Sequence, residues 1–194
     1  MARKHLAAIK NIGHNLAHFA GEKAKEEVLE GSEKLAKVSD PTQIALWVQG
    51  AIERLDRTVD KQTRTRIMEE CGYACAEANR KAIDQVLAKR KKYRSLDEFL
   101  EAEKARPLPG MRFEKKGKTL YQYYAPQSFR HPMRCFCSLL RGLPSEETVS
   151  VTYCQCSKGF VQKMWDRVLG KPVKVEVLET AVTGAKECKF KVNL

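Results

Sequence analysis

The sequence lacks any long hydrophobic run. No apolar stretch approaches the roughly 20 residues that a helix needs to cross a bilayer. The chain starts with Arg3 and Lys4, as a secretory signal would, but Lys10, Asn11 and His14 interrupt the apolar segment that should follow, and no Ala-x-Ala cleavage site comes after it. We therefore expect the N-terminus to be retained and the protein to be cytoplasmic, without membrane contact.

The signature motifs of several large protein classes are missing as well. The sequence has no Gly-rich phosphate loop, no Gly-x-Ser-x-Gly elbow and no dinucleotide-binding fingerprint, which argues against a kinase, a serine hydrolase or a dehydrogenase. Helix-turn-helix, RNA-recognition and double-stranded-RNA-binding signatures are also absent. There is no internal repeat and no linker long enough to separate two domains, so we expect the 194 residues to form one domain.

What the sequence does contain is an excess of positive charge. It has 36 Lys and Arg residues against 24 Asp and Glu, a formal net charge of +12. Part of this excess forms a basic patch, which we interpret as the solvated end of a helix. Binding of a nucleic acid or an acidic partner through it ranks last among the functions considered. The patch comprises Lys89, Arg90, Lys91, Lys92 and Arg94.

The first hundred residues carry a helical pattern. Apolar residues recur at steps of three and four between positions 6 and 19 and again between 44 and 59. Asp40 followed by Pro41 predicts the start of the second of these helices. A third helix is expected over about 63–89, and the capping box Ser95–Glu98 opens a short fourth.

Alternation replaces the helical pattern after the segment 106–110. It predicts a hairpin over 111–125 that turns at residues 116–118, strands over 134–140, 148–156, 171–180 and 188–194, and one helix over 158–170. The clean alternation of the last strand is typical of an antiparallel sheet with one face in water. The fold class is therefore α+β: a helical portion, 1–106, packs on an antiparallel sheet with one inserted helix, 107–194, within the same single domain.

Six of the seven cysteines form three closely spaced pairs. In a reducing cytoplasm, clustered thiols indicate metal binding or reactivity rather than disulfides. Two residues apart in a strand, or four apart in a helix, both sulfurs of a pair point the same way. Four thiolates can form a closed zinc site, the first choice here, and an iron–sulfur cluster is the second. The predicted metal ligands are Cys135, Cys137, Cys154, Cys156, Cys71 and Cys75.

Two other interpretations of these cysteines stay open. Each of them can be a small core hydrophobe, as we expect for Cys188, which alternates with apolar residues in the last strand. Alternatively, a thiolate beside Arg130, His131 or Arg134 attacks an electrophilic carbon. His131 is in addition a candidate metal ligand or general base.

The chain also resembles known families. Residues 152–194 resemble the end of the 4-vinyl-reductase-like domain, where a cysteine-bearing strand, a Gly-aromatic helix start and a closing Gly-x-x-x-Cys-x-Phe strand follow one another. The matching residues are Cys154, Gly159, Phe160, Gly170, Glu176, Gly184, Cys188 and Phe190. The segment 67–79, together with "RCFC" and "YCQC", is similar to bacterial aminothiazoline-carboxylate-hydrolase-like proteins and their uncharacterised relatives.

This resemblance implies a ligand-binding α+β superfold shared with haem nitric-oxide sensors and with subunits of the vesicle-tethering transport particle. In it a helical layer packs on a twisted antiparallel sheet with a cavity between them, and helices form a homodimer. The function expected first is the binding of a small molecule or a metal through the clustered cysteines. The alternative is a hydrolase-like enzyme that opens a cyclic carbon–nitrogen bond with a metal-activated water or a thiolate.

Overall fold

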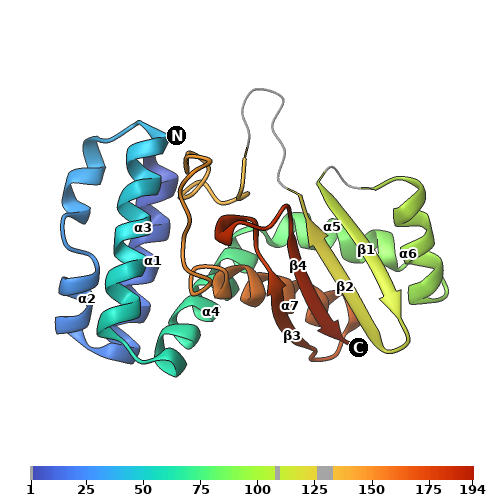
Figure 1. The fold of residues 1–194 in the computed structure, drawn as a ribbon. Helices are drawn as coiled ribbons and strands as arrows, with labels where there is room; N and C mark the ends of the chain where they lie inside the picture. The colour runs from blue at the N-terminus through green and yellow to red at the C-terminus, as the bar shows by residue number, and fades with distance from the viewer. Residues whose placement is uncertain (1, 108–109, 126–132) are drawn as a thin grey trace.

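The computed structural model describes residues 2–107, 110–125 and 133–194. Within these ranges, six α-helices precede the first strand (Figure 1). They are α1 (Ala2–Ala20), α2 (Glu22–Val28), α3 (Pro41–Thr58), α4 (Lys61–Ala78), α5 (Arg80–Arg90) and α6 (Leu96–Ala105), with a 3₁₀ turn over Ser32–Lys37. The strands are β1 (Met111–Lys116), β2 (Thr119–Tyr124), β3 (Lys174–Glu179) and β4 (Cys188–Asn193), and α7 (Gln155–Leu169) lies between β2 and β3 in the chain. The predicted α+β class is confirmed.

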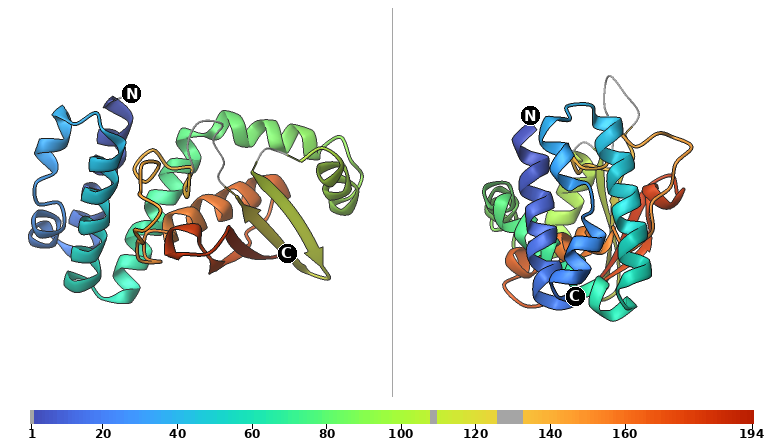
Figure 2. Two further views of the ribbon diagram at one scale, coloured as in Figure 1. Left: turned by 45° about the horizontal axis from the view of Figure 1, so that its top comes forward. Right: turned by 90° about the vertical axis from the view of Figure 1, so that its left-hand side faces the viewer.

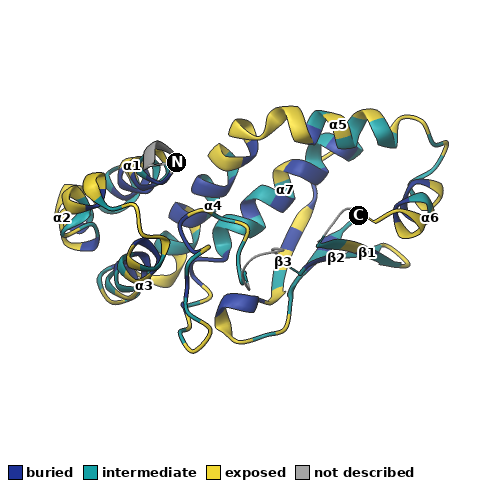
Figure 3. Cartoon of the chain, turned by 90° about the horizontal axis from the view of Figure 1, so that it is seen from above, coloured by how far each residue is buried: buried dark blue, intermediate teal, exposed yellow. Residues whose placement is uncertain are grey.

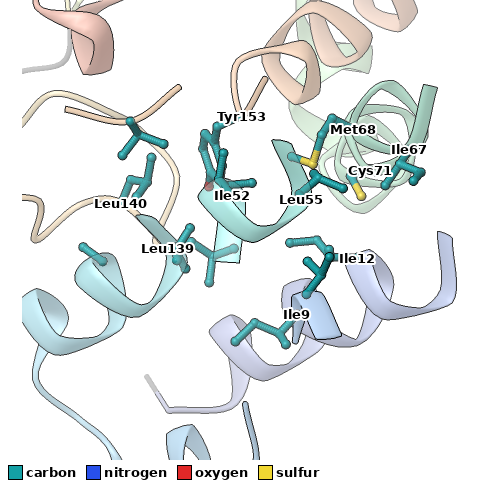
Figure 4. Packing of buried hydrophobic residues seen from close by; sticks show 14 of the residues in the cluster. Ile9, Ile12, Ile52, Leu55, Ile67, Met68, Cys71, Leu139, Leu140 and Tyr153 are labelled. Atoms are coloured by element: carbon teal, nitrogen blue, oxygen red, sulfur yellow. The ribbon is translucent and has the colours of Figure 1, made fainter. Parts of the chain in front are cut away.

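Helices α1 to α3 lie together at one end of the molecule (Figures 1 and 2). Asp40 caps α3 by accepting a hydrogen bond from the backbone N–H of Thr42 at 3.0 Å, and Pro41 occupies the first turn, as expected. The whole predicted apolar face of α3 is buried: Ile44, Val48, Ala51, Ile52, Leu55 and Val59. With α1 and residues 139–154 it forms the first hydrophobic cluster (Figure 4).

The prediction of a single helix over about 63–89 is wrong, because the structure has two separate helices there, α4 and α5. The chain leaves helical geometry at Asn79 (φ −104°, ψ 17°). The Asn79 side-chain amide donates to the carbonyl of Cys75 at 2.8 Å, a local bond that competes with helix continuation. The apolar periodicity continues across this break, so periodicity alone does not reveal it.

The four strands form one antiparallel sheet in the order β1-β2-β4-β3. The predicted hairpin is confirmed, with Gly117 at its turn in the left-handed region (φ 57°). One face of the sheet packs against α7 through Phe113 and Phe190, which with Trp165 belong to the second hydrophobic cluster. The opposite face carries Tyr121 beneath the ammonium group of Lys189, the wet face that the alternation predicts.

Residues 134–140 and 148–156 are not strands, contrary to prediction. Residues 134–140 and 148–154 belong to an irregular segment, 133–154, between the N-terminal helices and the sheet, and residues 155–156 start α7 (Figures 1 and 2). The guanidinium of Arg134 bonds the carbonyls of Pro144 at 3.1 Å and Ala181 at 2.9 Å, so it supplies donors that a neighbouring strand would otherwise provide. The alternation of β-branched residues after position 147 instead leads into turns and then into α7.

Each hydrophobic cluster contains residues from both predicted portions of the chain. The first adds Leu139, Leu140 and Tyr153 to the N-terminal helices, and the second adds Ile83 and Phe99 to the sheet. The division into 1–106 and 107–194 stays a prediction. Among the described residues, no helix combines the length and apolarity required to cross a bilayer.

Candidate thiol site where two helices cross

Helices α4 and α7 touch backbone to backbone at two glycines. A Cβ atom on Gly72 of α4 would lie 2.0 Å from the carbonyl oxygen of Cys156, and one on Gly159 of α7 would lie 2.4 Å from the carbonyl oxygen of Glu69. Only glycine permits such an approach. Figure 3 shows α7 lying between α4 and the sheet. This crossing therefore places the start of α7, with Cys156, directly against the part of α4 that carries Cys71.

Four thiols gather around this crossing. Burial, followed by the charges of Cys137, Cys71, Cys75 and Cys135 in that order, raises the pKa of Cys156 well above its usual value. Burial is also the main reason that the pKa of Cys71 rises to about 11, and Cys75 adds to that rise. Charges act on one another this way only at close range in a partly desolvated site. We call Cys71, Cys75, Cys137 and Cys156 the four-thiol set.

Two buried polar side chains direct their hydrogen atoms at sulfurs of the four-thiol set. The Asn15 amide of α1 donates to Cys71 Sγ at 3.2 Å, and the Tyr153 hydroxyl donates to Cys137 Sγ at 3.1 Å. Asn15 and Tyr153 are 8% and 3% exposed. Figure 4 shows Cys71 on α4 and Tyr153 on the segment before α7, with Ile52 and Leu55 of α3 between them in this view. The Cys71 sulfur thus accepts a hydrogen bond from another helix, and the Cys137 sulfur accepts one from elsewhere in the same irregular segment.

The two members of the helical pair differ in their surroundings. Cys71 is buried, whereas Cys75 is exposed as a residue, although partial burial of its thiol still raises its pKa. Cys75 receives a long hydrogen bond, 3.6 Å, from the side-chain amide of Asn79, which is itself exposed. Because Cys71 is buried and accepts the shorter hydrogen bond, its sulfur is held more firmly than the sulfur of Cys75.

The other three cysteines form a second group beside the first. Burial raises the pKa of Cys135, and the charges of Cys137, Cys154 and Cys188 raise it further. Cys154 is buried, with its pKa raised to about 12 chiefly by burial. Cys188 Sγ accepts the backbone N–H of Ala181 at 3.3 Å. Cys188 is expected in the core, because it alternates with apolar residues in the last strand. This pattern is that of an ordinary core residue, so it does not indicate that Cys188 lies beside other cysteines.

The strands in which the two Cys-x-Cys pairs were expected do not form. Cys154 is the residue before α7 and Cys156 lies in its first turn, so the two sulfurs do not share a strand face. Cys135 and Cys137 lie in the irregular segment, where the Cys137 N–H donates to Cys135 Sγ at 3.4 Å. The crossing instead unites Cys156 with Cys137 and with the helical pair of α4.

The four-thiol set offers sulfur atoms as ligands, which suit thiophilic ions. Over residues 2–107, 110–125 and 133–194, no group of three or more His, Cys, Asp or Glu side chains is arranged to hold a metal ion. His131, the predicted ligand or base, lies outside the described residues. Burial raises the pKa values of six thiols, namely Cys71, Cys75, Cys135, Cys154, Cys156 and Cys188, which favours their protonated form.

The basic patch at the end of α5 is partly used within the fold. Lys89 pairs with the carboxylate of Glu103, which is 3% exposed, and Arg90 donates to the carbonyl of Tyr93 at 2.8 Å. The remaining members, Lys91, Lys92 and Arg94, are exposed. The patch lies on α5 and the turn before α6, apart from the helix crossing.

Residues 6–194 match a protein family of unknown function, DUF6144. The match covers nearly the whole chain, so the protein belongs to this family. No curated protein matches the chain. The resemblance to the 4-vinyl-reductase-like and aminothiazoline-carboxylate-hydrolase-like families stays a prediction.

Proposed function

We propose that this member of the DUF6144 family is a cytoplasmic metal-binding protein whose four-thiol set holds a thiophilic metal. Zinc is the first choice, because four thiolates match its tetrahedral preference, and an iron–sulfur cluster is the second. The observation that carries the proposal is the gathering of sulfurs from three separate segments around one glycine-dependent helix crossing. A reducing compartment agrees with the seven cysteines, all of which are free thiols.

The hydrogen bonds to sulfur support this proposal. A cysteine that only fills space in a core requires no donor. Here Asn15 and Tyr153, both buried, direct their donors at Cys71 and Cys137. Donors of this kind stabilise thiolate charge and orient metal ligands, the role of the outer shell in metal sites.

Metal binding in this site must release protons. Burial raises the pKa of Cys71 and of Cys156 and so favours their protonated form in the metal-free protein, and only the thiolate is a metal ligand. Loading therefore requires deprotonation and a small rearrangement of side chains that draws the sulfurs together. Cys135 and Cys154 lie beside the set and stay further candidates for ligation.

Metal and acid-labile sulfide analysis of anaerobically purified full-length protein tests the proposal. We expect stoichiometric zinc without sulfide, or iron with sulfide and visible absorption. Cys137→Ser should lower the metal content, whereas Cys188→Ser, a substitution outside the four-thiol set, should retain it. A metal-free protein whose free energy of unfolding does not change when zinc is added would contradict the proposal.

The exposure of Cys75 favours a second candidate function, a hydrolase-like enzyme that opens a cyclic carbon–nitrogen bond. Catalytic zinc sites keep one position for water, and a ligand at an exposed edge can yield such a position. The thiolate version of this mechanism is less favoured, because burial raises the pKa of the thiols. Ring opening of a thiazoline substrate by metal-loaded protein, above the rate of metal-free protein, is the test; equal rates would contradict it.

A further inference from the structure

The outward face of the sheet combines two tyrosine rings with cations at its centre. The strand register places Arg112 of β1, Tyr123 of β2 and Lys189 of β4 in one row across the sheet. The guanidinium carbon of Arg112 lies 3.5 Å from the centroid of the Tyr123 ring. The ammonium nitrogen of Lys189 lies 5.6 Å from the same ring and 5.3 Å from the ring of Tyr121. We call Arg112, Tyr121, Tyr123 and Lys189 the sheet platform.

No helix of the described residues covers the sheet platform. Helices α6 and α7 pack on the other side of the sheet, where Phe99 and Trp165 join the second hydrophobic cluster (Figures 1 and 3). Tyr123 is only 6% exposed beneath its cations, whereas Tyr121 is half-buried and Arg112 is exposed. The planar groups that the platform presents to solvent are therefore the Tyr121 ring and the Arg112 guanidinium.

The charge of this face is only partly neutralised within the fold. Among the described residues Lys189 forms no ion pair, not even with Glu179, its register partner on β3. Residues 107–194 together carry 15 Lys and Arg against 7 Asp and Glu, so the field around the sheet attracts anions. The other cations of the face are paired, namely Arg112 with Glu187, Lys116 with Glu114 and Lys191 with Glu176. Lys189 is thus the central cation whose charge is left for a ligand.

We propose that the sheet platform binds single-stranded RNA. Bases that are free of a duplex stack on aromatic rings and on guanidinium planes, and a cation between the stacked bases contacts the backbone phosphate. Tyr121 and Arg112 supply the two planes, and Lys189 supplies the cation. A duplex keeps its bases stacked on one another, and an acidic peptide has a charge without planar bases, so neither uses the platform fully. The inference does not depend on the thiol site.

The polar row beside the platform favours RNA over DNA. Thr119 of β2 is the register partner of Asn193 of β4 on the same face of the sheet. A hydroxyl and an amide at this position can both bond the 2′-hydroxyl group, which DNA lacks. The platform is assembled across three strands, so it has no signature within any one segment of the sequence.

The experiment measures the binding of a fluorescent single-stranded RNA of mixed sequence, roughly 12 nucleotides long, to the full-length protein by anisotropy. We expect binding that weakens as salt rises. Tyr121→Leu should weaken it by about 5- to 100-fold, because one stacking plane is lost. Tyr73→Leu is the matched control and should leave binding unchanged, since Tyr73 also lies near a lysine, Lys163, at 4.7 Å, but on α4.

A second pair of variants tests the phosphate contact. Lys189→Gln should weaken binding and make the logarithmic salt slope shallower by about 0.7, the value for one phosphate of a single strand. Lys91→Gln removes the same charge from the basic patch and should leave both quantities as they are in the unmodified protein. Circular dichroism of each variant confirms that its helices are intact.

Several results would overturn the inference. One is the absence of RNA binding at low salt, and another is binding that Tyr121→Leu and Lys189→Gln leave unchanged. A duplex of the same sequence that binds as tightly would show that bases do not stack on the platform. Single-stranded DNA that binds more tightly than RNA, or polyglutamate that displaces RNA at equal charge, would identify a different ligand.

Discussion

Tyr153 places the only polar group of its side chain against a sulfur. Its ring is part of the first hydrophobic cluster, and its hydroxyl donates to Cys137 Sγ at 3.1 Å. Burial, followed by the charges of the nearby thiols, raises the pKa of this tyrosine, so the hydroxyl keeps its proton and remains a donor. The residue thus combines a packing role with a hydrogen bond to one cysteine sulfur.

Replacement of this hydroxyl should weaken metal binding without loss of the fold. Tyr153→Phe keeps the ring and removes the donor, so we expect the zinc affinity to fall by about 10- to 100-fold, the range for outer-shell partners. Tyr93→Phe, at the turn before α6, is the matched control and should leave the affinity unchanged. Competition titration against a zinc chelator measures both variants. Equal affinities for the two would show that the hydroxyl does not support a ligand.

The raised cysteine pKa values give the metal-free protein a defined pH dependence. The pKa of Cys71 rises from 9.0 to about 11, and that of Cys154 from 9.0 to about 12. The folded state favours the protonated thiols, so their stabilisation is complete below the unfolded value of 9.0 and is lost as the pH rises through the folded values. We expect the free energy of unfolding to fall by about 1 to 3 kcal/mol between about pH 8 and about pH 11.

Urea unfolding of the metal-free protein at these two pH values is the measurement. Zinc-loaded protein is the control, because bound thiolates have no proton left to lose and should show a smaller decrease. A free energy of unfolding that rises with pH would mean that the thiols are not buried as the structure places them.

At the scale of elements, the crossing of α4 and α7 is the feature on which the thiol site depends. Its two glycines permit backbone contact, and the ion pair between Lys158 and Glu69 joins the same two helices. A wider crossing would separate Cys156 from the α4 pair. The crossing therefore links helix packing directly to the geometry of the site.

A methyl group at the crossing should damage both stability and binding. In Gly72→Ala the new Cβ would lie 2.0 Å from a backbone oxygen that cannot move alone, so we expect a loss of at least about 2 kcal/mol in the free energy of unfolding and weaker zinc binding. Gly50→Ala in α3 is the matched control: its Cβ meets only the flexible end of Arg54 at 3.4 Å, and a gain of about 0.5 to 1 kcal/mol is expected. Thermal or urea unfolding compares the two. Similar effects at both positions would exclude a tight crossing.

The sequence pattern correctly predicts those helices and strands that are stabilised mainly by contacts between residues close in the chain. The capped helix α3 and the hairpin of β1 and β2 follow from Asp40, Pro41 and the turn at Gly117. The alternation of the Cys-x-Cys segments predicts strands that the structure does not contain, because this alternation is local while the contacts that decide the shape of the segments are distant. Arg134 fixes that segment through carbonyls as far away as Ala181.

The same limit applies to the site. Its cysteines were identified from their spacing, but their grouping depends on a contact between residues 72 and 156 that no local pattern encodes. Gly72 inside the "CGYAC" segment and Gly159 inside the predicted helix 158–170 are the signals in the sequence that point to it, since a glycine within a helix often marks a close approach. Asn15 carries no signal of its role, because its partner Cys71 is 56 positions away.

At the scale of the whole molecule, the thiols lie between the two hydrophobic clusters. Cys71, Cys137 and Cys156 pack with the first cluster, Cys188 packs with the second, and α4 contributes residues to both. A metal bound by the four-thiol set would tie α4, α7 and the irregular segment together. Binding should therefore stabilise both clusters at once.

The two tryptophans report on the two clusters separately. Trp47 packs against the first cluster, and Trp165 is fully buried in the second. The Trp47→Phe variant leaves Trp165 as the only tryptophan. Zinc should raise the unfolding midpoint measured by Trp165 fluorescence as much as it raises the midpoint measured by helical circular dichroism. A zinc effect on circular dichroism without one on Trp165 fluorescence would mean that the metal stabilises the N-terminal helices alone.

X-ray absorption at the metal edge of the loaded full-length protein tests the central claim most directly, because it counts the atoms bound to the metal. The gathering of Cys71, Cys75, Cys137 and Cys156 predicts a first shell of four sulfurs at about 2.3 Å, reduced to three in Cys156→Ser. A shell dominated by nitrogen and oxygen, or one that Cys156→Ser leaves unchanged, would contradict it.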